Sequence, residues 1–148
     1  MVFATHALRA SESKKLIGID QPALLVGENS STGESKGSWL TAGRIELLSM
    51  DADLVVLSAC NTRSPDSNDS SALSGLARAF FAAGARGVMA TTWYIDAAKT
   101  RELLTDIAEN AKGSEPNQLP SAMQIAMSRR AGEGLSPRDW ALFTYVGR

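Results

Sequence analysis

Runs of apolar residues and the polar stretches between them divide the chain into alternating strands and helices. The strongest strand signal is residues 54–59 (LVVLSA), which is apolar on both faces, as in a central parallel strand covered by helices on each side. Residues 88–93 predict a second buried strand, and residues 2–5 and 141–146 predict a first and a last strand. Residues 22–27 are predicted to form one strand of a small hairpin.

Apolar residues at helical spacing occupy the segments between these strands. Residues 72–83 place Leu76 and Phe80 on one face, and Gly84 stands where a left-handed cap would end the helix. Further helices are predicted from the capping residues Thr41 and Asp96, and from the helical intervals between Ala122, Ile125 and Ala126. Alternating strands and helices predict an α/β fold, a three-layer αβα sandwich around a mainly parallel sheet.

Polar segments between these elements are predicted to be mobile loops at about residues 28–38, 61–71 and 113–120. The length of 148 residues fits a single domain spanning residues 1–148. We find no internal repeat, so the elements are expected to form one layered unit.

Composition narrows the classes of function. A formal net charge of −1 argues against nucleic acid or an anionic membrane as a partner, and no apolar run approaches the ~20 residues that span a bilayer. The chain holds one cysteine and one histidine, so an intramolecular disulfide and a four-ligand zinc site are both excluded. A free thiol fits a reducing, cytoplasmic location.

Candidate chemistry lies at the ends of two predicted strands. His6 follows the strand at residues 2–5, and Cys60 follows the strand at residues 54–59. Ligands of open parallel sheets bind at the carboxyl ends of the strands, so neighbouring strands would bring a thiol and an imidazole to one edge. Two structural alternatives stay open here: a cysteine packed as a small apolar residue, and a histidine that makes a structural hydrogen bond.

The same residues resemble a known family. Residues 54–62 (LVVLSACNT) resemble the signature around the catalytic cysteine of CHAT domains. Residues 76–88 are similar to the helix and strand that follow it, residues 92–96 to the tryptophan-containing turn, and residues 140–147 to the closing strand. Residues 3–6 (FATH) resemble the segment that bears the catalytic histidine.

CHAT domains are relatives of caspases and separases and are often joined to tetratricopeptide repeats. The resemblance implies a caspase-like cysteine endopeptidase in which Cys60 attacks the scissile carbonyl and His6 assists proton transfer. It implies that the backbone N–H groups of Ala7 and Cys60 stabilise the oxyanion. It also implies a thiol pKa below the ordinary value of about 8.5. The substrate would be a protein or peptide and the partner a tetratricopeptide-repeat region, with no metal or organic cofactor; the substrate-binding residues are not identified.

Three features depart from the family pattern. Ala7 stands where the family has glycine after the histidine, and would be strained if that position needed a positive φ. Arg63 replaces the glycine of an Asn-Thr-Gly motif, which is expected to reshape the loop beside the nucleophile. The chain also begins at the histidine strand, so we expect a partial domain without its N-terminal strands. One sheet edge would then be exposed for pairing with another copy.

These departures leave a second interpretation open, a CHAT-like protein-interaction module that has lost its activity. A third interpretation, a flavodoxin-like domain that binds a small anion, has no sequence motif behind it. A ligand bound far from Cys60 would be needed to support it.

Overall fold

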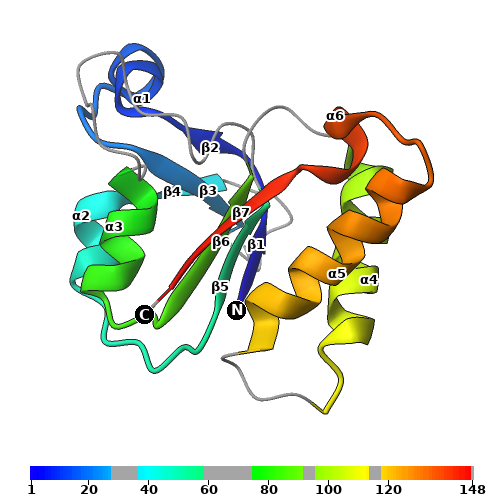
Figure 1. The fold of residues 1–148 in the computed structure, drawn as a ribbon. Coiled ribbons are helices and arrows are strands. Elements are labelled where there is room, and N and C mark those ends of the chain that lie inside the picture. The colour runs from blue at the N-terminus through cyan, green and yellow to red at the C-terminus, as the bar shows by residue number, and fades with distance from the viewer. Residues whose placement is uncertain (28–36, 59–74, 92–95, 114–117, 148) are drawn as a thin grey trace.

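The protein is a mixed α/β fold around a four-stranded sheet, as the sequence predicts (Figure 1). The computed structural model describes residues 1–27, 37–58, 75–91, 96–113 and 118–147. The strand order is β1-β5-β6-β7, in which β1, β5 and β6 run parallel and β7 runs antiparallel to β6. These strands are β1 (Val2–Ala4), β5 (Val55–Ser58), β6 (Gly87–Thr91) and β7 (Phe143–Gly147).

Helices cover both faces of this sheet and complete the αβα sandwich. In Figure 1, α2 (Ala42–Glu46) and α3 (Gly75–Ala82) lie on one side of the sheet, and α4 (Ala97–Asn110) and α5 (Leu119–Gly132) lie on the other. Alternate residues of β5 face opposite sides of the sheet. Val55 and Leu57 pack with α2 and α3, whereas Val56 packs with residues of α4 and α5. The run of apolar residues that predicted this strand is therefore explained by burial of both faces of the strand.

A smaller antiparallel sheet stands beside the first and has the order β2-β3-β4. Its strands are β2 (Ala7–Leu8), β3 (Ala23–Gly27) and β4 (Gly37–Thr41). The hairpin predicted from residues 22–27 is confirmed as β3 paired with β4. Ala23 and Leu24 are fully buried, so this hairpin packs into the same core as α2 and α3.

Predicted helix ends agree closely with the observed ones. The Thr41 side chain accepts a hydrogen bond from the Arg44 N–H, and the Asp96 carboxylate accepts from the first turn of α4. Gly84 has a φ of 108°, and a Cβ there would lie 2.3 Å from the Met50 carbonyl oxygen. Only glycine fits this turn without displacing backbone.

Other details differ from the sequence-based expectation. Two helices were not predicted, α1 (Ala10–Ile17) and α6 (Pro137–Trp140). β4 begins at Gly37 and α5 begins at Leu119, so residues 37–38 and 119–120 of the predicted loops belong to regular structure, while residues 28–36 and 114–117 lie outside the described residues. The loop predicted at about 61–71 lies outside the described residues. Ile125 is 56% exposed, in contrast to the buried Ala122 and Ala126 on the same helix.

An ion-pair cluster joins α4 to α5. The Asp106 carboxylate accepts hydrogen bonds from Arg130 Nε at 2.8 Å and from Arg130 Nη2 at 2.7 Å, and Arg129 Nη2 lies 2.8 Å away. Burial alone would raise the pKa of Asp106, but the hydrogen bonds from Arg130 and Arg129 outweigh it and lower the pKa below its ordinary value. The Arg130 side chain is only 11% exposed, and its other carboxylate partner, Glu102, is more distant at 3.7 Å, so Asp106 is its closer partner.

We expect Asp106→Asn to lower the free energy of unfolding at pH 7 by about 1–2 kcal/mol, because a charged acceptor is lost beside a buried guanidinium. A carboxyl group whose pKa is lower in the folded than in the unfolded state stabilises the fold at pH values above its unfolded-state pKa of about 3.9. This stabilisation is lost as the pH falls through the folded-state pKa. Urea unfolding should therefore separate wild type from Asp106→Asn at pH 7, and the difference should shrink as the pH falls through the folded-state pKa of Asp106. Glu46→Gln, an exposed change of the same kind on α2, is the control. An equal effect of both substitutions would contradict the role given to the cluster.

Candidate functional site

The two strands that lead to His6 and Cys60 are neighbours in the sheet. β1 and β5 run parallel, and Val2 pairs with Val56, Phe3 with Leu57 and Ala4 with Ser58. His6 comes two residues after Ala4. Cys60 comes two residues after Ser58 and lies outside the described residues, as does Arg63. The strand neighbourhood on which the predicted dyad depends is thus present up to Ser58.

His6 lies at the junction between the two sheets. The chain leaves β1 after Ala4 and enters β2 at Ala7, and in this short connection it is held by β3. The Thr5 hydroxyl donates to the Leu25 carbonyl oxygen at 2.7 Å, and the Leu25 N–H donates to the His6 carbonyl oxygen at 2.8 Å. These bonds fix the backbone of His6 and leave its ring exposed to solvent.

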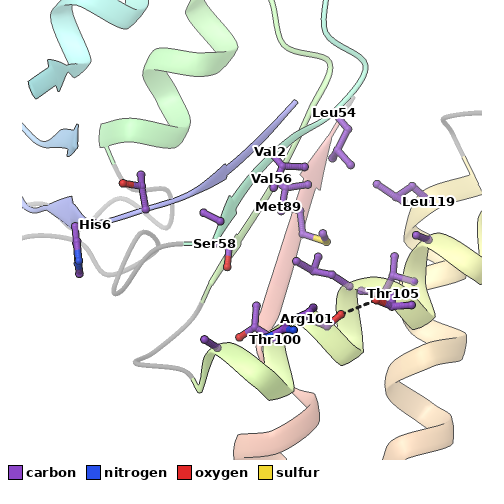
Figure 2. Close-up of a pocket in the computed structure, with 16 residues that line it drawn as sticks. Val2, His6, Leu54, Val56, Ser58, Met89, Thr100, Arg101, Thr105 and Leu119 are labelled. Carbon is purple, nitrogen blue, oxygen red and sulfur yellow. Dashed lines mark hydrogen bonds between the residues drawn. The ribbon is translucent and has the colours of Figure 1, made fainter. Parts of the chain in front are cut away.

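Side chains of β1 and β5 divide between the two faces by alternation. Phe3 packs against Phe80 of α3, with ring centroids 5.2 Å apart. Val2, Ala4 and His6 instead face the α4 side, where they line a trough (Figure 2). Ser58 faces that side too. Even-numbered positions of both strands therefore share the face on which the imidazole lies.

This trough has a volume of about 830 Å³ and runs along β1, between the sheet and α4 (Figure 2). His6 and Ser58 lie toward one end and Leu119 toward the other. Most of the lining is apolar, and Arg101 is the only permanently charged side chain among the described residues that line it. The trough stays open because β1 is an edge strand of the described sheet, with Val2 62% exposed. Among the described residues, none covers the approach to His6 along this trough.

Ala7, the predicted oxyanion donor, lies in strand β2 opposite Leu24. The neighbouring pair, His6 and Leu25, is joined by the Leu25 N–H. In an antiparallel ladder bonded and non-bonded pairs alternate, so the N–H of Ala7 points away from β3 and is not used by that pairing. An extended strand also accommodates alanine without strain, which removes the concern raised by the missing glycine.

Two acidic residues near strand ends have structural roles. Asp53 precedes β5, at the end of the sheet opposite to His6, and forms an ion pair with Arg86. Asp51 pairs with the same guanidinium, and both carboxylates help to raise the pKa of Arg86. Asp96 caps α4. Neither Asp53 nor Asp96 lines the trough.

Thr5 and Ser58 were not singled out from the sequence, although both border the trough. Ser58 could have been found, because alternation along the predicted strand at residues 54–59 places it on the same face as Val56, which also lines the trough. The contact of Thr5 with Leu25 spans twenty residues of sequence and has no local signal.

No helix in the described part of the chain is long and apolar enough to cross a membrane. No curated protein matches this chain. The family model of the CHAT domain matches residues 1–148, the whole of the chain. The strand order, the helices on both faces and the position of His6 at a strand end agree with the resemblance seen in the sequence. This chain belongs to the CHAT domain family.

Proposed function

We propose that this chain carries the site of a caspase-like cysteine endopeptidase, with Cys60 as nucleophile and His6 as its partner. The observation that carries the proposal is the parallel pairing of β1 with β5, which ends in the pair Ala4 and Ser58. His6 and Cys60 each follow this pair by two residues, the spacing that returns a strand side chain to the same face. Ala4, two residues before His6, and Ser58, two residues before Cys60, both face the trough.

The chemistry follows from these two groups. The Cys60 thiolate attacks the scissile carbonyl carbon, and its electron pair forms the S–C bond while the carbonyl oxygen becomes an oxyanion. The N–H of Ala7, which β3 does not use, supports a role for that backbone group in binding the oxyanion. Collapse of the intermediate expels the amine, which takes a proton from the His6 imidazolium and leaves a thioester. Water then hydrolyses the thioester and releases the carboxylate product and the free thiol.

Access supports a polypeptide as the substrate. The His6 ring is exposed and borders an open trough, so an extended chain can approach it without displacing any described element. The alternative, an interaction module without activity, predicts a Cys60 thiol that behaves like a thiol in a small peptide.

Covalent labelling separates these two functions. Because Cys60 is the only cysteine and His6 the only histidine, a peptidyl chloromethyl ketone reports on one thiol, and His6→Ala removes the only imidazole. At pH 6.5 an ordinary thiol is about 1% ionised. We therefore expect the wild type to label at least about tenfold faster than His6→Ala or than the urea-unfolded chain. Ser128→Ala, an exposed change on α5, should label like the wild type. Equal rates for wild type, His6→Ala and unfolded chain would favour the inactive module.

A further inference from the structure

We propose that Thr5 positions the His6 imidazole for reaction, by fixing the backbone from which the ring extends. This inference rests on the proposed peptidase function and concerns the same site. Thr5 is a positioning residue in this role, since its hydroxyl acts on His6 through the main chain of β3.

Thr5 and His6 are both held by the main chain of one residue. The Thr5 hydroxyl donates to the carbonyl oxygen of Leu25, and the N–H of Leu25 donates to the carbonyl oxygen of His6. Leu25 is in turn paired with Trp39 of β4, so the holding residue lies within a sheet with a partner on its other side. The backbone on both sides of the His6 Cα atom is therefore fixed to β3.

The imidazole itself receives no such support from the rest of the described chain, where it makes no hydrogen bond. In many nucleophile–base pairs a third group orients the base. Within the described residues, the orientation of the ring depends on the two torsions of its own side chain and on the backbone that carries it. Loss of a backbone contact next to His6 should consequently move the ring.

The Thr5 hydroxyl also explains how the strand changes sheets. In a regular antiparallel pair the N–H of His6 would donate to the Leu25 carbonyl oxygen. The Thr5 hydroxyl donates to this oxygen instead, which anchors the chain to β3 two residues before the regular ladder of Ala7 with Leu24 begins. Thr5 is thus the point at which β1 is joined to the small sheet.

The test compares Thr5→Val, which keeps the shape and removes the donor, with Thr5→Ser, which keeps the donor. We measure the rate of Cys60 alkylation by iodoacetamide from pH 5 to pH 9, with His6→Ala and wild type beside them. Thr5→Val should lower the rate of Cys60 alkylation at pH 6.5 by roughly tenfold. This is less than the ~10²-fold loss of rate that a 1 Å displacement of a catalytic group can cause. It should also move the inflection of the profile toward that of His6→Ala. Thr5→Ser should stay within about twofold of the wild type. Thr144→Val makes the same chemical change in β7, at the far edge of the sheet, and should leave the profile unchanged.

Each outcome is decisive. If wild type and His6→Ala share one profile, the dyad fails and the role of Thr5 with it. If those two differ and Thr5→Val matches the wild type, the role of Thr5 is overturned while the peptidase proposal stands. Equal slowing of Thr5→Val and Thr5→Ser overturns it as well, because the hydroxyl would not be responsible. The far-UV circular dichroism spectrum reports whether each variant is folded. If Thr5→Val is unfolded, Thr5→Ala replaces it, and unfolding of both would assign Thr5 to stability alone and overturn the proposal.

Discussion

Replacing Cys60 by alanine is expected to abolish peptide-bond cleavage, with a fall in rate of roughly 10⁴-fold or more. No other cysteine is present to replace the nucleophile, and removing a nucleophile from a covalent mechanism leaves only the contribution of substrate binding and the oxyanion donors. A proteome-derived peptide library incubated with wild type or Cys60→Ala, and read by mass spectrometry for new amino termini, measures this directly.

Ser128→Ala is the matched control, since it is a comparable reduction in side-chain size on the exposed face of α5. It should cut the same peptides as the wild type. Identical cleavage by Cys60→Ala and wild type would assign the cuts to another protease and contradict the proposed nucleophile. If neither cuts and the thiol also labels at the rate of a model thiol, the interaction module becomes the better description.

Phe80→Ala should lower the free energy of unfolding by about 3–5 kcal/mol. The Phe80 ring is fully buried between α3 and the sheet, and it packs tilted by 42° against Phe3 of the edge strand. Removing it leaves a cavity in the core that contains Leu57 and Val88, and it deprives Phe3 of β1 of its aromatic partner. A loss of this size is a large part of the 5–15 kcal/mol typical of a whole domain.

Urea unfolding followed by far-UV circular dichroism measures this effect. Phe81→Ala is the matched control: the same substitution at the next position, where the ring is only partly buried, should cost much less. Equal losses at the two positions would show that Phe80 has no special place in the core. Phe80→Leu, which keeps most of the volume, should fall between wild type and Phe80→Ala.

The sequence predicted the elements whose burial leaves a pattern. The strand at residues 54–59 and the caps at Thr41 and Asp96 were found because burial on two faces and side-chain capping are local properties. The helix α1 was missed because its segment reads as polar: only Ser13 is buried. Its first turn is held by Glu12, which accepts hydrogen bonds from the Arg9 side chain and the Arg9 backbone, contacts that lower the pKa of Glu12.

Other features depend on tertiary arrangement that no local pattern records. A buried strand looks the same whichever way it runs, so the antiparallel direction of β7 could not be predicted from residues 141–146. The candidate site required β1 and β5 to be neighbours, which the sequence allowed us only to assume. Thr5 was overlooked because its partner, Leu25, is distant along the chain.

The hold of Leu25 on both Thr5 and His6 means that the imidazole is carried by one sheet while the cysteine follows a strand of another. If His6 and Cys60 act together as we propose, the distance between imidazole and thiol depends on how the two sheets are oriented, and a rotation of the β3–β4 hairpin would change it. Substitutions in that hairpin could weaken catalysis without touching substrate, and a protein bound to the hairpin could tune the same distance from outside.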